Sequence, residues 1–307
     1  MKTAQASDLV HVERGEQTSG ADSIYLYCFA RASMARHIHC EGIDGRGRVA
    51  AIASGDVAAI FSAVSLEEFT DAASDKPRDL DWVIPRACRH DEVVKQVMPK
   101  SPVLPVRFGS VFSSREELKN LLAEKAGEIS RFLDRVEGKE EWVVQAFMNL
   151  AKTRSRLLSL DPDLLLQQQA MSGSPGSRYL CEKRLQAEGD RRLRDYRRLI
   201  AGAVREDLAH YAEESRVLRL RSGPSETSPA GEGSDEMILH CAFLVARGSI
   251  ADFLARVKVP QIAGADEIQL RPTGPWPPYD FCPSILVPDP GPAAGTGPDR
   301  GKNGDSS

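Results

Sequence analysis

Short apolar runs alternate with longer amphipathic segments along the chain, a pattern typical of a mixed α and β protein. Near the start, residues 24–29 alternate as expected of a strand. Two further apolar runs, 49–53 and 57–64, flank Ser54-Gly55-Asp56, which predicts a β-hairpin. Together with the helix predicted after them, these strands indicate a small α+β domain over residues 23–100.

A second domain, 101–288, is predicted from the order of the elements that follow. These are a strand at 103–112, a helix from Ser114 to Val136, strands at 141–148 and 237–246, a short helix that begins at Gly248-Ser249, and a strand at 267–271. The order β-α-β-β-α-β is that of a ferredoxin-like unit, with its first and third strands central. Because Pro105 cannot donate to a sheet ladder, pairing of the first strand is expected to begin near Val106.

A helical insertion at about residues 150–220 is expected between the second and third strands of this unit. Its main helix places apolar side chains at helical spacing, namely Leu185, Leu193, Tyr196, Ile200, Val204, Leu208 and Tyr211. A Gly-, Pro- and Ser-rich stretch at 221–235 predicts a flexible loop. The ends of the chain, 1–22 and 289–307, lack apolar periodicity and are expected to be disordered tails. The predicted fold class is therefore α+β.

Composition excludes several classes of function. Of the 307 residues, 27% are charged and 41% are apolar, and the formal net charge of -4 gives no sign of a general nucleic-acid binder. No apolar run approaches the ~20 residues that cross a bilayer, and residues 1–20 lack the apolar core of a signal peptide. The six cysteines form no C-x-x-C pair, which favours a reducing cytoplasm. We expect neither nucleic acid nor a membrane as a partner.

Three short segments contain residue types that other proteins use in catalysis or ligand binding, but none of the segments is sufficient to form such a site. His37-Ile38-His39-Cys40 offers two histidines on one face, which do not fill a zinc site. Gly45-Arg46-Gly47 is too short for a phosphate-binding loop. His90-Asp91-Glu92 lies in a predicted helix, where neighbouring side chains splay apart, so a solvated helix face is expected there. We therefore expect no catalytic residues, no cofactor and no metal.

The main helix of the insertion is rich in arginine. Residues 178–205 hold nine basic and four acidic residues. A basic helix on a ferredoxin-like unit could bind RNA or a small molecule, and this stays the alternative function. The acidic side chains interleave with the basic ones, however, and the strands lack the aromatic pattern of RNA-binding sheets. A protein-docking face is therefore favoured, with Arg191, Arg194 and Arg198 free to meet an acidic partner surface.

Thr273–Phe281 is a Pro- and Gly-rich segment with three aromatic rings, those of Trp276, Tyr279 and Phe281. Two interpretations are open: the rings pin the last strand against the other domain, or they line an exposed ligand groove. The first is favoured, because three rings left in water would form an unusual surface patch.

Four motifs, taken in order along residues 24–285, resemble those of the GvpF/GvpL family of gas vesicle proteins. They are Leu104-Pro-Val-Arg-Phe-Gly-Ser-Val-Phe112, which contains Arg107, Phe108 and Gly109; Gly138-Lys-Glu-Glu-Trp142; Ser174-Pro-Gly-Ser-Arg-Tyr-Leu180, which contains Tyr179; and Thr273-Gly-Pro-Trp-Pro-Pro-Tyr-Asp-Phe281. Each motif is short, and their combination in this order is what is similar to the family.

The resemblance implies a two-domain protein that is not an enzyme and that helps to build the hollow protein shell of gas vesicles. It implies as partners the small shell protein and other gas vesicle accessory proteins. The chain departs from the family at Gln145, where a lysine is common, and in its expanded loop 221–234. Partner contacts at these two places are therefore not carried over.

Overall fold

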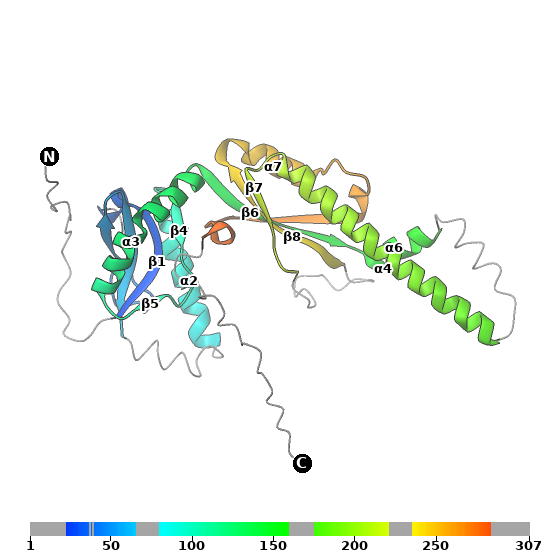
Figure 1. Ribbon diagram of the computed structural model, residues 1–307, viewed down its shortest axis with the longest axis horizontal. Helices are drawn as coiled ribbons and strands as arrows, with labels where there is room; N and C mark the ends of the chain where they lie inside the picture. Colours follow the sequence, from blue (N-terminus) through cyan, green and yellow to red (C-terminus); the bar gives the residue numbers. More distant parts are fainter. Residues whose placement is uncertain are drawn as a thin grey trace, which may run out of the picture.

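Two antiparallel sheets, each covered by helices, make up the part of the chain that the structure describes (Figure 1). The structure is a computed structural model and describes residues 23–36, 38, 40–65, 80–159, 175–220 and 235–283. The predicted α+β class is confirmed. The predicted tails and the loop at 221–234 lie outside the described residues.

The first sheet has the order β2-β3-β1-β4, and β5 also pairs with β1. Its strands are β1 (Ser23–Arg31), β2 (Ala50–Ser54), β3 (Val57–Val64), β4 (Val103–Pro105) and β5 (Val111–Phe112). The predicted hairpin is confirmed, since Ser54 pairs with Val57 across a two-residue turn. A short 3-10 helix, η1 (Ala32–Arg36), follows β1.

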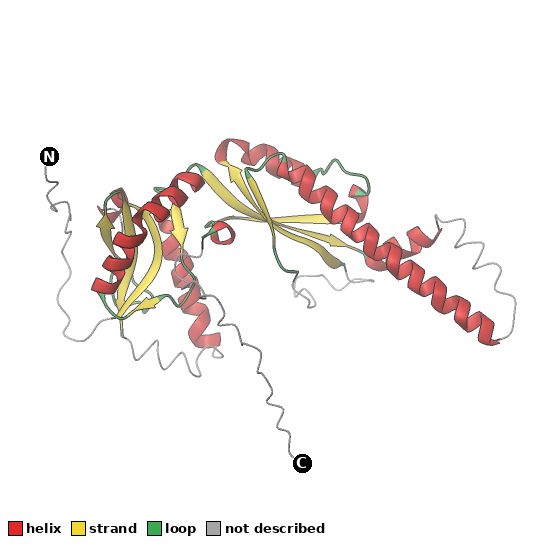
Figure 2. Cartoon of the chain, viewed as in Figure 1, coloured by secondary structure: helices red, strands yellow, loops and turns green. Residues whose placement is uncertain are grey.

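Both faces of this sheet are covered, which explains why β1 is buried almost throughout (Figure 2). Helix α2 (Leu80–Val97) packs against Tyr25 and Tyr27, whereas α3 (Arg115–Val136) packs against Leu26 and Phe29. A register shift between Leu26 and Cys28 in β1 interrupts the simple alternation of faces. Pro85 is accommodated within α2, in its second turn.

Helix α3 begins after Ser114, which caps its first turn. The Ser114 hydroxyl accepts from the backbone N–H of Glu117 at 3.2 Å, and the Glu117 carboxylate accepts from the Ser113 N–H at 2.9 Å. At the other end, Gly138 has φ 69°, the left-handed conformation that ends a helix without a Cβ clash. The chain passes directly from this glycine into the second sheet.

The second sheet has the order β7-β8-β6-β9. Its strands are β6 (Lys139–Met148), β7 (Glu214–Val217), β8 (Glu236–Ala246) and β9 (Ile268–Trp276). Helices α6 (Pro175–Ala209) and α7 (Ile250–Lys258) pack on one face, where Val204 and Phe253 meet Phe243. Short 3-10 helices, η3 (Arg247–Ser249) and η4 (Ala265–Glu267), flank α7.

The elements assigned to the predicted ferredoxin-like unit are wrong, because its predicted first strand joins the first sheet and its predicted first helix packs on that sheet. β4 pairs with β1 (Cys28 with Pro105), and α3 packs on the β1 side chains. The described sheets therefore divide at Gly138 rather than near residue 100. A β-α-β-β-α-β order does occur, but it runs from β6 to β9 and counts α6 as its first helix.

The predicted insertion is consequently not an insertion. Helix α6 connects β6 to β7 and buries Ile200, Val204 and Leu208 on the sheet. β7 lies in a stretch that was expected to be helical. It pairs with β8 through four residues, three of which are exposed, so it lacks the apolar alternation that marks a strand.

The strand predicted at 103–112 is broken in two by a turn at residues 107–110. Residues 103–105 and 111–112 both pair with β1, so pairing does not wait until Val106 as expected. β4 is an edge strand of the described sheet, where a proline that cannot donate is tolerated. β8 is central, as predicted, with partners on both sides.

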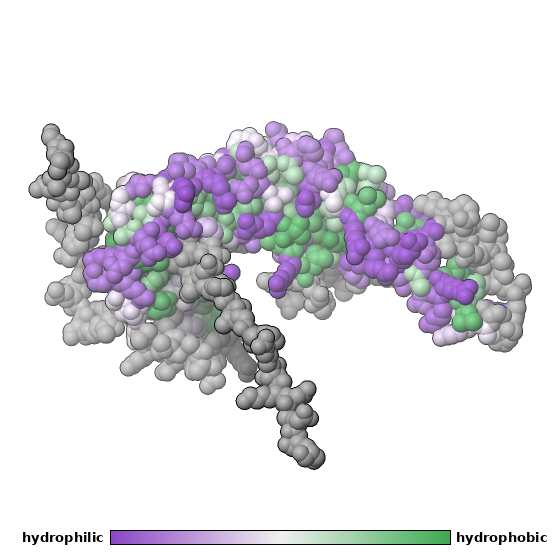
Figure 3. All heavy atoms as spheres, in the orientation of Figure 1, coloured by the Kyte–Doolittle hydropathy of each residue, from purple (hydrophilic) through white to green (hydrophobic). Residues whose placement is uncertain are grey.

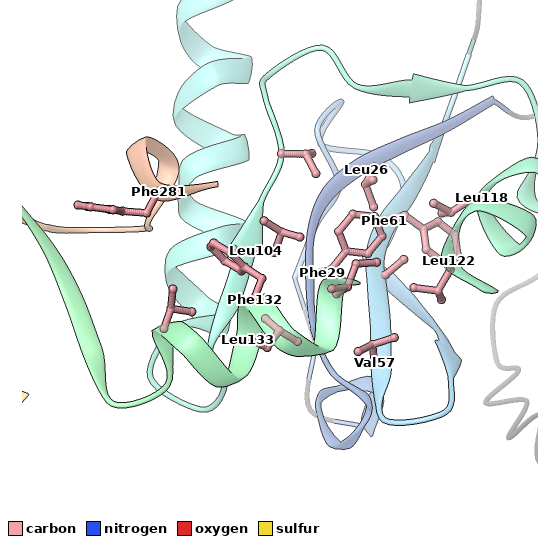
Figure 4. Packing of buried hydrophobic residues seen from close by; sticks show 14 of the residues in the cluster. Leu26, Phe29, Val57, Phe61, Leu104, Leu118, Leu122, Phe132, Leu133 and Phe281 are labelled. Carbon is pink, nitrogen blue, oxygen red and sulfur yellow. The ribbon is translucent and has the colours of Figure 1, made fainter. Parts of the chain in front are cut away.

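One hydrophobic cluster spans both sheets and joins them beneath α3. It combines Phe29 of β1 and Phe132 of α3 with Leu244 of β8. Phe281, on the short 3-10 helix η5 (Tyr279–Phe281), belongs to the same cluster and lies at its margin (Figure 4). The last segment thus carries an aromatic ring from the end of β9 back to the first sheet, as the favoured interpretation of Thr273–Phe281 predicts.

Phe281→Ala is expected to lower the free energy of unfolding by about 3–5 kcal/mol, since the ring is 2% exposed at the junction of the two sheets. Tyr279→Ala is the matched control, because that ring is 36% exposed and should cost clearly less. Urea unfolding of both variants measures the difference. Equal losses in the two variants would show that the Phe281 ring does not join the sheets.

Candidate functional site

The motif residues Phe108 and Gly109 lie in the turn between β4 and β5, at one end of the first sheet. The Gly109 N–H donates to the Tyr25 hydroxyl at 3.2 Å, and that hydroxyl lies 2.9 Å from His90 Nδ1. The Phe108 ring stands at 6.1 Å from the His90 ring, edge to face. Arg107 is exposed beside them. These residues hold a turn against α2, and their arrangement is structural.

His90 is buried, so the predicted solvated face at His90-Asp91-Glu92 is wrong for this residue. Its side chain points between Tyr25 and Tyr27 and is 3% exposed. Burial lowers the pKa of His90 to about 4, which keeps the ring neutral near pH 7. Asp91 and Glu92 do face outward, where they pair with Lys95 and Arg89. These three side chains therefore do not converge on a common point.

The motifs around Trp142 and Trp276 pack against each other. Gly274 has φ 150°, and a Cβ there would lie 3.0 Å from the Trp142 ring and from the Glu141 carbonyl. Only glycine permits so close an approach of β9 to β6. Trp276 is half-buried, and the Lys95 ammonium of α2 lies 4.9 Å from its ring centroid. The two motifs thus form one contact that reaches both domains.

A buried polar network lies in this junction, and sequence reasoning missed it. Glu141 is 2% exposed, and its carboxylate accepts from the Asp280 N–H at 3.1 Å. The Asp280 carbonyl accepts from Arg216, and the Phe281 carbonyl accepts from Arg135. Burial raises the pKa of Glu141 to about 8, and the neighbouring Asp280 carboxylate adds to the rise. Glu141 precedes the motif tryptophan, but nothing in its local pattern marks it as buried.

Two cavities in the described part of the chain do not match a typical small-molecule site. A cleft of about 150 Å³ at the junction, lined in part by Gly138, Trp276 and Pro278, is smaller than the ~300–1,000 Å³ usual for ligands. The other, about 520 Å³, has a largely charged and polar lining that includes the Arg156–Glu267 ion pair. Ligand pockets are mostly apolar, so the small-molecule alternative gains no support.

Helices α4 (Leu150–Ser159) and α6 form an arm that projects past the strands (Figure 1). Hydrophilic side chains gather along the visible side of this arm (Figure 3). Near its tip, Tyr179 is 58% exposed, with the Lys183 ammonium 5.7 Å from its ring centroid. Tyr179 therefore does not meet the other motif residues.

Arg191, Arg194 and Arg198 are all exposed on α6, opposite the side that packs on the sheet. The Arg191 guanidinium forms a two-pronged ion pair with Glu188 of the same helix, at 2.9 and 2.6 Å. The structure gives Arg194 and Arg198 no ion pair with any described residue. These side chains share one face of the arm and are available to a binding partner.

Other kinds of site find little support in the described ranges. No group of three or more His, Cys, Asp or Glu side chains is placed to hold a metal ion there. His37 and His39 lie outside the described residues. Within those residues, no helix is both long and apolar enough to span a membrane.

Comparison with known proteins identifies the family. The family model "Gas vesicle synthesis protein GvpL/GvpF" matches residues 23–283. The chain belongs to the GvpL/GvpF family. This membership gives the protein a gas vesicle-related role.

Relatives in sequence agree with this assignment, and solved GvpF structures share the fold. The chain is 26% identical to gas vesicle protein L of a Streptomyces species, covering 74% of this chain and 80% of the relative. It is 29% identical to gas vesicle protein L2 of Halobacterium salinarum, covering 69% and 76%. The crystal structure of GvpF from Anabaena is similar with a TM-score of 0.64 and 18% identity, covering 85% of this chain and 98% of that one.

Stability is expected to fall as pH rises from about 6.5 to about 8, because of Glu141; below about 6.5 the lowered pKa of His90 acts in the opposite direction. Folding favours the protonated carboxyl, so its contribution is fully present below the unfolded pKa and is lost as pH rises through the folded pKa. Glu141→Gln should remove most of this fall, whereas Glu140→Gln on the same strand should not. Urea midpoints between pH 5 and pH 9 measure it, and a wild-type slope retained in Glu141→Gln would contradict the assignment.

Proposed function

We propose that this protein acts in the assembly of gas vesicles by binding other gas vesicle proteins, without catalysing a reaction. Its partners are the shell protein and other gas vesicle accessory proteins, which it meets in the cytoplasm and at the vesicle. Membership in the GvpL/GvpF family supports the role. The observation that carries the mode of action is the projecting arm, on whose outer face Arg194 and Arg198 form no ion pair with a described residue.

The arm is well suited to docking because it is held firmly at its base. Ile200, Val204 and Leu208 of α6 are buried on the second sheet. Arg256 of α7 forms a two-pronged ion pair with Asp207 of α6, with both side chains largely buried. A partner that binds the outer half of α6 is therefore held at a defined distance from both sheets.

The chemistry of the outer face favours an acidic partner surface. Guanidinium groups form paired hydrogen bonds with carboxylates, so exposed arginines suit a protein that presents Asp or Glu. The contact of Arg191 with Glu188 is exposed and exchangeable, since surface ion pairs contribute only ~0–1 kcal/mol. Such charges act mainly on the rate and specificity of encounter rather than on the fold.

Reversing Arg191, Arg194 and Arg198 to glutamate is expected to leave the fold intact and to slow or abolish vesicle formation. All three side chains are exposed, so their substitution removes no packing. Circular dichroism tests the fold, and vesicle yield is measured in a host whose own copy of the gene is deleted.

The matched control reverses three exposed basic residues elsewhere, Lys100, Arg131 and Lys258, for the same change in net charge. Normal vesicles are expected from this control. Normal vesicles from the well-folded arm variant would place the docking surface elsewhere. Equal loss in both variants would mean that overall charge, rather than the arm, is responsible.

A further inference from the structure

The arginines of the arm recur at every seventh residue. Arg184, Arg191, Arg198 and Arg205 lie within α6, are all exposed, and form what we call the arginine row. Residues seven apart in a helix are separated by about 10.5 Å along the axis. They drift by only about 20° per heptad, so the four remain on one side of the helix. The row is therefore about 32 Å long.

The row is held by few contacts within the protein. Arg191 pairs with Glu188, and none of the other three row members forms an ion pair with a described residue. Arg194 stands three residues after Arg191 on the same face and widens the row. The opposite side of α6 carries the buried contacts with the sheet, so the row faces away from the rest of the molecule.

An acidic row runs beside the arginine row with the same spacing. Glu188 and Asp195 are seven residues apart and follow Arg184 and Arg191 by four residues each. Asp195 is exposed, and Glu188 is half-buried beneath Arg191 and Arg192. The arm thus presents alternate charges in two parallel rows rather than a uniformly positive surface.

Two parallel rows of opposite sign match a helix better than a nucleic acid. Duplex DNA carries one negative charge per ~1.7 Å of its axis, so it would meet the acidic row as well as the arginine row. A partner helix repeats its own side chains every ~10.5 Å at seven-residue spacing and can oppose both rows at once. Like charges placed opposite each other would reject partners in the wrong register.

We propose that the outer face of α6 binds an α-helix of another gas vesicle protein, an inference that rests on the proposed function. The partner helix carries acidic residues at every seventh position and basic residues in a neighbouring row. Between Arg184 and Arg198 this face offers only Ala187 as an apolar residue on the line of the row. Leu180 and Leu199, 60% and 66% exposed, add apolar contact at its margins. The contact is therefore mainly electrostatic and weakens with salt.

The test uses the full-length protein and a synthetic helical peptide about four heptads long, with glutamate at every seventh position and lysine four residues later. Binding is measured by fluorescence anisotropy at several salt concentrations. We expect saturable binding that weakens as salt rises. Arg184→Gln with Arg198→Gln should weaken it about tenfold, the upper range for two exposed pairs. Arg131→Gln with Lys258→Gln, exposed on α3 and α7 and therefore off the row, should change it little.

Each other outcome overturns the inference. It fails if the regular peptide does not bind, if a peptide of the same composition with irregularly spaced glutamates binds equally well, or if a single-stranded RNA binds more tightly. Equal loss in the row and off-row variants also overturns it. Vesicle formation distinguishes the helical-partner inference from the proposed function. If the arginine-to-glutamate variant blocks vesicles while the peptide shows no preference for the row, the proposed docking function is retained and the inference of a helical partner is rejected.

Discussion

The hydrophobic cluster beneath α3 is the interaction on which the rest of the structure depends. It contains side chains of β1, α3, β8 and η5, so one continuous core serves both sheets. Because packing in such a core is close to that of a crystal, the sheets cannot slide past each other without losing contacts. Phe281 is the most distant contributor in sequence, and it fastens the end of β9 to the first domain.

The same junction also buries polar groups, at a cost in stability. Glu141 is enclosed beside Asp280, and each buried charge must be matched by hydrogen bonds or neutralised. The protein meets this demand with backbone donors and with a raised pKa. A network of this kind allows few alternative arrangements, so it specifies how the two domains meet while making their contact sensitive to pH.

Under the proposed function, the family motifs form the frame of the protein and the arginine face of α6 contacts the partner. Phe108 and Gly109 close the first domain, while Trp142, Trp276 and Phe281 join it to the second. The arginines of α6 lie outside this frame on the projecting arm, where substitutions alter a surface without disturbing the core. We infer that the GvpL/GvpF fold is maintained at the junction and that partner choice is made on the arm.

The amino-acid sequence by itself determined the local elements and the family. The hairpin at Gly55, the Ser114 cap and the apolar stripe of α6 each depend on residues within a few positions of one another, and the motif at Thr273–Phe281 is similarly local. Tertiary structure alone decided that β4 joins β1, that β7 is a strand, and that His90 and Glu141 are buried. Short edge strands contain too few residues for a period to show, and burial depends on neighbours far away in the chain. For that reason the longer elements were predictable, whereas the short edge strands and the pairing partners were decided by packing.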